Sequence, residues 1–116
     1  MKPLTTVELA AVLRIDPGTV YRLKKRGLLP SQQIGGRMHF RPSKLIPALH
    51  HFYVGPPREK PSSLPTDWMK PVDVADYLGR SLGTVLRWAR KGELPYYRLG
   101  AHCVRFRLGE LEEAIG

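Results

Sequence analysis

The chain contains one sequence pattern twice, and this internal repeat constrains its fold more than any other feature. Residues 4–35 and 69–100 align at a fixed offset of 65 and share eleven identities. After a one-residue insertion the offset becomes 66, and further identities follow at Phe40/Phe106, Arg41/Arg107, Leu45/Leu111 and Ala48/Ala114. A self-match of this length indicates two copies of one structural unit. Each copy has about 50 residues, a size at which a unit buries few side chains and is marginally stable alone.

The charge of the chain is unevenly divided between the two copies. The 116 residues carry a net charge of +9, which favours a polyanionic partner, nucleic acid first and an acidic membrane surface second. Residues 1–52 have nine Lys/Arg against two acidic residues, whereas residues 67–116 have eight against seven. The first copy is therefore expected to be the stronger electrostatic anchor.

The cysteine count and the hydropathy of the sequence indicate its cellular compartment. Cys103 is the one cysteine, so the sequence has no disulfide framework and no cysteine-rich zinc site. Nothing resembles a signal peptide, and no stretch approaches the ~18–20 apolar residues of a membrane span. We expect a cytoplasmic, nucleoid-associated protein without a membrane partner, metal or cofactor.

Each copy begins with signals for two short helices. Thr5, with a glutamate three residues later, is a capping-box signal for a helix over residues 6–13. Asp16 and Pro17 suit the start of a second helix, which runs to about Arg26 and ends before a glycine. Two helices joined by so short a turn predict a helix-turn-helix.

The rest of the first copy predicts a hairpin and a third helix. Residues 33–34 and 37–41 lie on either side of a Gly-Gly turn and predict two short strands, which would form a wing. Ser43 is expected to cap a helix over residues 44–52. Residues 53–66 contain four prolines and two serines and predict a semi-extended linker that reaches about 43 Å at ~3.1 Å per residue.

The second copy repeats this plan. Pro71 is expected to open its first helix, Ser81 to cap its second, and residues 96–106 to form a slightly longer wing before a helix over residues 110–115. The fold class that follows is mainly α with small β-hairpin wings. We predict two tandem winged helix-turn-helix domains, residues 1–52 and 67–116, joined by the proline-rich linker at 53–66.

The second helix of each copy has an apolar face and a basic face. Val20 and Leu23 match Val85 and Trp88, and we interpret these positions as core, although Trp88 has base stacking as an alternative. Arginine can bond a guanine edge through two donors, while threonine and lysine suit phosphates. The opposite face therefore supplies the candidate DNA-binding residues Thr19, Arg22, Lys25, Arg26, Thr84, Arg87, Arg90 and Lys91.

The two wings add further cationic candidates. A wing-tip arginine can enter a narrow A·T-rich minor groove, where the negative potential is enhanced, and Arg37 is the first candidate for this role. A solvated basic loop is the alternative at each of these positions. The wing candidates for DNA contact are Arg37, Arg41, Arg98, Arg105 and Arg107.

These residues resemble a known superfamily. The segments TVYRLKKRGLLP…IGGRMHFR…KL and TVLRWARKGELPYYRLGAHCVRFR…EL are similar to the winged helix-turn-helix of the excisionase and MerR-like DNA-binding superfamily. The resemblance implies that the second helix enters the major groove and the wing contacts the minor groove or backbone. It gives Arg22 and Arg87 the base-contacting role and places Thr19 and Thr84 near phosphate.

The function expected from these patterns is sequence-specific binding of double-stranded DNA at a two-part site. Two roles are left open. The protein is either a small transcriptional regulator of a bacterial, phage or mobile-element system or an excisionase that bends attachment-site DNA. A third alternative makes the second copy a docking module for a recombinase or RNA polymerase, through its acidic residues Asp73, Asp76, Glu110, Glu112 and Glu113. No catalytic pattern is present, and we expect a non-enzymatic monomer whose two domains imitate a dimer.

Overall fold

A computed structural model describes residues 2–116, and in it the chain forms two compact units. The first unit comprises the residues up to His51 together with Lys60–Thr66, and the second comprises Phe52–Glu59 together with Asp67–Gly116. The fold is mainly α with small antiparallel sheets, as predicted. Each unit is described by itself below.

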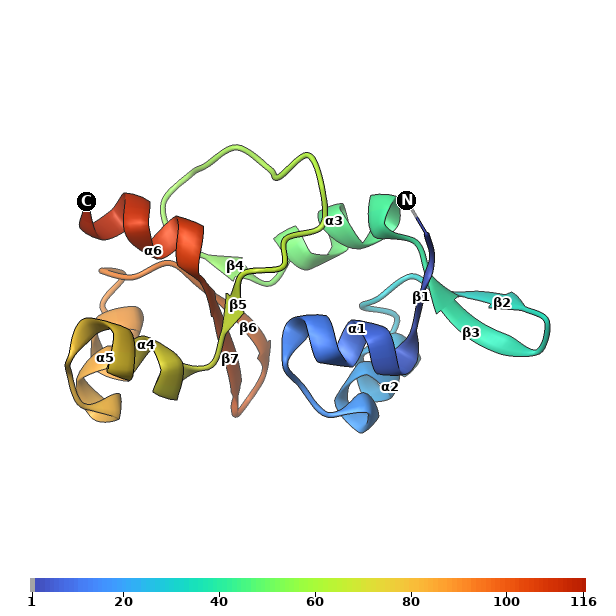
Figure 1. Cartoon of the computed structure of the whole chain (residues 1–116), viewed down its shortest axis with the longest axis horizontal. Helices are drawn as coiled ribbons and strands as arrows, with labels where there is room; N and C mark the ends of the chain where they lie inside the picture. Colours follow the sequence, from blue (N-terminus) through green and yellow to red (C-terminus); the bar gives the residue numbers. More distant parts are fainter. Residues whose placement is uncertain (1) are drawn as a thin grey trace. The chain divides into compact units, whose positions relative to one another are not determined.

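The first unit is a helix-turn-helix followed by a hairpin and a third helix (Figure 1). The helix over residues 6–13 is confirmed, and the predicted capping box is present: Glu8 N–H donates to Thr5 Oγ1 (3.1 Å), and Thr5 N–H donates to Glu8 Oε1 (2.8 Å). The elements are β1 (Leu4–Thr5), α1 (Thr6–Leu13), α2 (Pro17–Lys25), β2 (Gln32–Ile34), β3 (Arg37–Phe40) and α3 (Pro42–His50).

The hairpin of the first unit is extended by a strand that precedes its helices. The sheet order is β1-β3-β2, and Leu4 pairs with Phe40 in antiparallel register. This pairing ties the start of the chain to the wing, so the hairpin is anchored at its base while β2 forms an outer edge. The fully buried residues beneath the sheet are Leu9, Leu13, Val20, Phe40 and Leu45.

The second unit repeats this architecture and adds one strand. Its sheet has the order β4-β6-β7-β5, where β5, β6 and β7 correspond to β1, β2 and β3 of the first unit. Val74, Val85, Phe106 and Leu111 are fully buried in its core. The elements are β4 (Tyr53–Val54), β5 (Trp68–Met69), α4 (Pro71–Leu78), α5 (Leu82–Arg90), β6 (Tyr96–Gly100), β7 (Cys103–Arg107) and α6 (Leu108–Ile115).

The additional strand β4 comes from the segment predicted to be a linker. Tyr53 pairs with Tyr97, and Arg98 N–H donates to the carbonyl oxygen of Phe52 at 2.9 Å. We call Phe52–Glu59 the strap, because it lies along the edge of this sheet. The domain boundaries at residues 52 and 67 stay a prediction. The first half of the segment between them is bonded to the second unit, so this half is not part of a free linker.

Two predicted helix starts are wrong. Ser43 does not cap α3, which begins at Pro42 with Arg41 at the N-cap position and no side-chain cap bond. Proline suits the first helical position because its missing N–H has no acceptor there. The last helix begins at Leu108, two residues before the predicted start, because Asp67 accepts a hydrogen bond from Gly109 N–H (2.9 Å) in its first turn. That acceptor is distant in the sequence, so local pattern could not show it.

Candidate nucleic-acid interface

Helix α2 presents a basic face because its opposite face is anchored in the core. Asp16 accepts a hydrogen bond from Gly18 N–H (2.7 Å) and Pro17 occupies the first turn, as predicted. A Cβ at Gly18 would lie 2.7 Å from the Asp16 carboxylate, so a larger residue here would displace the carboxylate from its present position in the cap. Val20 and Leu23 are buried, which turns Arg22 and the neighbouring Tyr21 toward solvent.

The side chain of Arg22 is held in place by Thr19. Arg22 Nη2 donates to Thr19 Oγ1 at 2.9 Å, one helical turn earlier on the same face. Thr19 itself is half-buried. This arrangement orients the guanidinium, and the spacing of three residues was a signal for it in the sequence. Lys25 and Arg26 follow at the exposed C-terminal end of the helix.

Helix α5 has the same plan with different side chains. Ser81 accepts a hydrogen bond from Thr84 N–H (3.2 Å), and its hydroxyl lies 2.8 Å from that of Thr84. The Thr84 hydroxyl is therefore engaged in the helix cap, whereas that of Thr19 supports an arginine. Arg87 and Arg90 are exposed, and Lys91 is exposed at the C-cap.

Trp88 packs against the core of the second unit, which confirms the packing interpretation. It is half-buried against the cluster that contains Val85 and Phe106. The guanidinium of Arg80 lies 5.8 Å from its ring centroid, a cation–π distance. Its ring is thus occupied on the protein side and is not a free stacking platform for a base.

The outer face of α5 is more apolar than that of α2. Leu82 is 45 % exposed and Leu86 is partly exposed, at the positions of Pro17 and Tyr21 in the first unit. Both leucines line a groove of about 400 Å³ between α5 and the second wing, which Arg90, Arg98 and Arg105 also line. The groove therefore combines apolar contact with positive charge.

The wings place their predicted arginines in different environments. Arg37 and Arg98 are exposed, whereas Arg105 is half-buried with Nη1 2.7 Å from its neighbour's carbonyl, Val104 O. Arg41 is exposed at the base of the first wing. In the first wing the Gly35-Gly36 turn has φ of +58° and +77°, which only glycine adopts readily.

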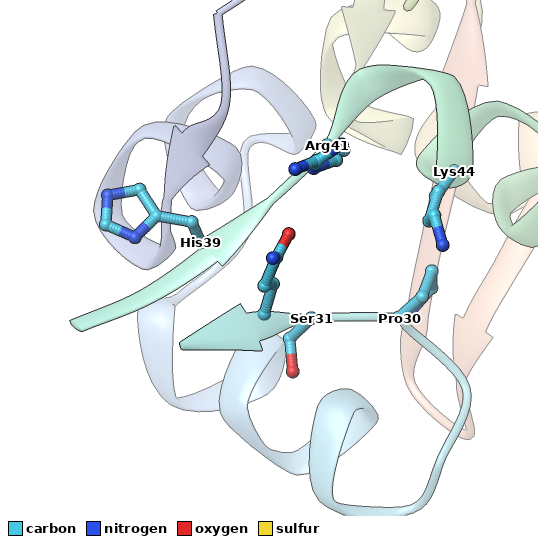
Figure 2. Close-up of a pocket in the computed structure, with 6 residues that line it drawn as sticks. Pro30, Ser31, His39, Arg41 and Lys44 are labelled. Carbon is cyan, nitrogen blue, oxygen red and sulfur yellow. The ribbon is translucent and has the colours of Figure 1, made fainter. Parts of the chain in front are cut away.

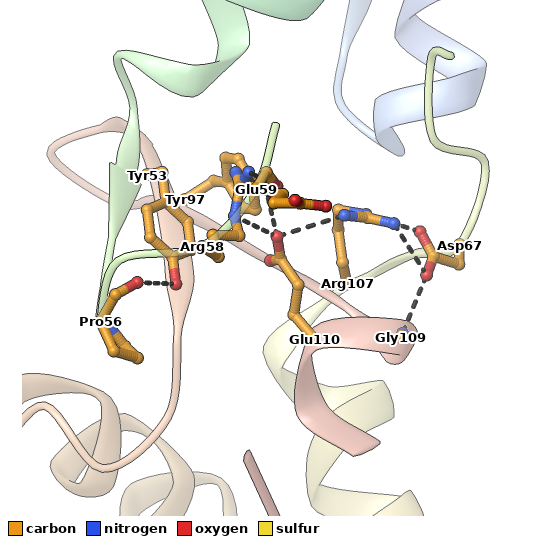
Figure 3. Close-up of polar contacts among 9 residues, drawn as sticks. All are labelled: Tyr53, Pro56, Arg58, Glu59, Asp67, Tyr97, Arg107, Gly109 and Glu110. Carbon is orange, nitrogen blue, oxygen red and sulfur yellow. Dashed lines mark hydrogen bonds and ion pairs between the residues drawn. The ribbon is translucent and has the colours of Figure 1, made fainter. Parts of the chain in front are cut away.

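Arg107 belongs to a partly buried ion-pair network. Its Nε lies 2.9 Å from Asp67 Oδ1, and its Nη1 lies 3.2 Å from Glu110 Oε2 (Figure 3). Arg58 Nε lies 2.6 Å from the same Glu110 oxygen, which also accepts a hydrogen bond from Tyr97 (2.8 Å). These contacts use the guanidinium of Arg107 inside the protein, so we leave it out of the proposed DNA contacts.

The network shifts the pKa values of its members. Burial raises the pKa of the Asp67 carboxyl, but the hydrogen bonds from Gly109 N–H and Arg107 outweigh burial and hold it below its ordinary value. Burial, reinforced by the charge of Glu110, raises the pKa of the Tyr97 hydroxyl far above its ordinary range. Both shifts favour the protonation states that bond within the network at neutral pH.

The acidic residues expected to dock a partner do not form one exposed set. Glu110 is 7 % exposed and is bonded inside the second unit, so its predicted docking role is wrong. Asp73 is half-buried and accepts a hydrogen bond from Lys70 N–H at 3.0 Å. Asp76, Glu112 and Glu113 remain exposed.

Comparison with known proteins agrees with this geometry. The model of the family described as helix-turn-helix domain matches the chain twice, over residues 3–46 and 68–115, which confirms the resemblance and the tandem repeat. No curated protein and no solved structure matches the chain. Among residues 2–116 no helix has the length and apolar character needed to span a membrane. The chain belongs to the helix-turn-helix domain family of DNA-binding proteins and contains two copies of the domain.

Proposed function

We propose that the protein is a small transcriptional regulator that recognises a two-part DNA site with α2 and α5. The observation that carries this proposal is the equivalent exposure of Arg22 and Arg87 on two helices whose opposite faces are buried. An arginine on the outer face of such a helix can donate two hydrogen bonds to O6 and N7 of a guanine in the major groove. One chain would then supply the two recognition helices that a dimer usually supplies.

The first unit provides the more basic contact. Thr19 fixes the Arg22 guanidinium before DNA arrives, which lowers the entropy lost on binding. Lys25 and Arg26 at the end of α2 and Arg37 on the wing are exposed cations suited to phosphates. Because phosphate contacts release counterions, the affinity of this unit should fall steeply with salt.

The second unit should recognise a different half-site. Its Leu82 and Leu86 present apolar surface beside Arg87, and apolar side chains in the major groove contact the thymine methyl group. At the same positions the first unit has Pro17 and Tyr21. The proposed site is therefore asymmetric, with a thymine-containing half-site for α5.

A matched pair of variants tests base recognition in the first unit. Arg22→Lys keeps the charge but removes the two-donor fork, so affinity for the preferred duplex should fall about tenfold and preference at one base pair should relax. Lys25→Ala should weaken binding to all duplexes alike. Fluorescence anisotropy on the preferred duplex and on single-base variants measures both. Equal loss on every duplex for Arg22→Lys would contradict the base-contacting role.

Two other roles follow from the same surfaces. An excisionase that bends attachment-site DNA needs the same two contacts, and a binding site beside a recombination core rather than over a promoter would favour it. A docking role for the second unit, toward a recombinase or RNA polymerase, is favoured by its exposed Leu82 and near-neutral charge. Unchanged DNA affinity of the Arg87→Glu, Arg90→Glu double variant would select the docking role.

A further inference from the structure

The first unit has an open, cationic pocket at the base of its wing. The pocket has a volume of about 330 Å³, and its lining contains cations but no carboxylate. Figure 2 shows Arg41 and the first turn of α3 on one side, where Lys44 extends toward Pro30, and the start of β2 on the other. The lining residues are Pro30, Ser31, Gln32, His39, Arg41 and Lys44.

The same place in the second unit is covered by the strap, which leaves a smaller pocket of about 190 Å³ between Arg58, Pro95 and Glu110. The repeat equates Gln32 with Tyr97 and Lys44 with Glu110. Arg58 of the strap bonds both Tyr97 and Glu110, and it lies 4.1 Å from the ring centroid of Tyr53 (Figure 3). The strap therefore places the charged side chain of Arg58 in this position, four residues after the end of β4.

The edge strand beside the pocket differs between the units in the same way. In the second unit, β6 is covered by β4 through the pairs Tyr53/Tyr97 and Val54/Tyr96. In the first unit, within the described residues 2–116, the equivalent strand β2 pairs with β3 alone, and all of Gln32–Ile34 is exposed. Unpaired N–H and C=O groups of an edge strand are a template for adding another strand.

Two acidic residues of the second unit, Glu110 and Asp67, have basic counterparts in the first unit. Glu110 faces the positive Arg58, whereas its counterpart Lys44 is positive. Asp67, which pairs with Arg107, has Lys2 as its counterpart at the offset of 65. A segment bound to the first unit as the strap is bound to the second would thus need a negative side chain where the strap has Arg58.

We propose that the first unit is a receptor for an extended acidic peptide segment of a partner protein. The segment adds a strand to the outer edge of β2 and places an Asp or Glu between Arg41 and Lys44, four residues beyond that strand. Addition of an extended peptide to a sheet edge is an established mode of recognition, in which the backbone gives affinity and a side-chain pocket gives specificity. The charge of the pocket supplies the specificity here.

A peptide fits these observations better than a DNA backbone does. The equivalent surface of the second unit is shaped around a polypeptide strand and lies beneath the strap. It also contains Asp67 and Glu110, so the position is not a surface that the two units share for binding phosphate. The open edge of β2 offers both N–H and C=O groups, which match a peptide backbone, whereas a phosphate can accept only from the N–H groups. Gln32 of this edge also lines the pocket, so a peptide added to β2 would continue into it.

The strap itself supplies the test peptide. The probe is a synthetic peptide with the sequence of residues 51–60 carrying Arg58→Glu, and its matched control is the unchanged sequence. Each is titrated to millimolar concentration into the full chain, and the backbone amide signals are followed by NMR. We expect saturable shifts at Gln32–Ile34 for the Glu peptide and binding at least about fivefold weaker for the Arg peptide, the scale of one solvent-accessible charge pair.

A charge-swapped protein makes the test decisive. In the Lys44→Glu variant the preference should reverse, so that the Arg peptide binds more tightly than the Glu peptide. Absence of saturable shifts at β2, equal binding of the two peptides, or shifts at β6 instead of β2 would overturn the proposal. If duplex DNA shifts the β2 amides and Lys44→Glu weakens DNA binding while no peptide binds, the pocket is a phosphate site and the proposal is wrong.

Discussion

In the first unit Phe40 and Leu45 are fully buried, and so are Phe106 and Leu111 at the matching positions of the second. At the residue directly before this leucine the two units differ in charge: Lys44 is exposed and lines an open pocket, while Glu110 is buried and paired with two arginines. The comparison shows that the two copies keep the same buried apolar residues and differ in the charged residues around them. In the second unit the strap covers this surface, whereas the equivalent surface of the first unit is open.

The largest expected effect is on the ion-pair network of the second unit. Glu110→Ala would leave Arg58 and Arg107 partly buried without their shared carboxylate and should lower the free energy of unfolding by about 3–5 kcal/mol. Lys44→Ala, the matched change in the first unit, should stay within about 0.5 kcal/mol because Lys44 is exposed. Urea unfolding followed by tryptophan fluorescence reports the second unit, since Trp68 and Trp88 both lie there, and the backbone amide NMR signals of Val20 and Leu23 report the first unit in the same titration. Similar losses in the two variants would contradict the comparison.

The next effect concerns DNA affinity. Arg22→Ala and Arg87→Ala should each weaken specific binding by about 1–3 kcal/mol, because each removes a proposed guanine contact. We expect the larger loss for Arg22, which Thr19 holds in place. Anisotropy with the preferred duplex at two salt concentrations measures both variants. A loss confined to Arg22→Ala would leave the second unit without a base-contacting role.

The pH dependence of stability should also separate the units. The folded-state pKa of Asp67 lies below its ordinary value, so the carboxylate contributes stability above the unfolded pKa of about 4, and this contribution is lost as pH falls through the folded value. The free energy of unfolding measured by tryptophan fluorescence should therefore decrease as pH falls below about 4. Asp67→Asn should be less stable at neutral pH and should lose less stability over that range. An Asp67→Asn profile parallel to that of the unchanged protein would remove the carboxylate from this account.

The smallest effect concerns the turn that follows the first helix of each unit. Gly79 has φ +65°, and the corresponding Arg14 has φ +58°. A side chain in this region is strained, so Gly79→Ala should lower stability by about 1 kcal/mol. Gly83→Ala is the control, because Gly83 lies inside α5 with open space around its Cβ position and alanine favours a helix. Destabilisation by both variants alike would contradict the strain argument.

The helices and wings could be predicted from sequence because their signals are local. Thr5, Asp16 and Ser81 cap the helices that their positions predicted, and the Gly35-Gly36 turn of the first wing forms as expected. The two-residue strands β1, β4 and β5 could not be predicted, because a strand so short exists only through its partner.

The candidate site was predictable to the extent that helical spacing determines exposure. Val20 and Leu23 are buried and Arg22 is exposed, as the period of 3.6 requires. Arg107 and Glu110 resembled surface charges because their partners, Asp67 and Arg58, are about 40 and 50 residues away in the sequence. The matched Arg41 lacks the Asp67 counterpart, so the repeat alone could not reveal the network.

The most direct test of the central claim is selection of bound duplexes from a random library by the full chain at physiological salt. The account predicts an enriched two-part motif with unequal halves, one changed by Arg22→Ala and the other by Arg87→Ala. Enrichment of one short motif that responds to Arg22→Ala alone, or of no motif, would contradict recognition of DNA by both units.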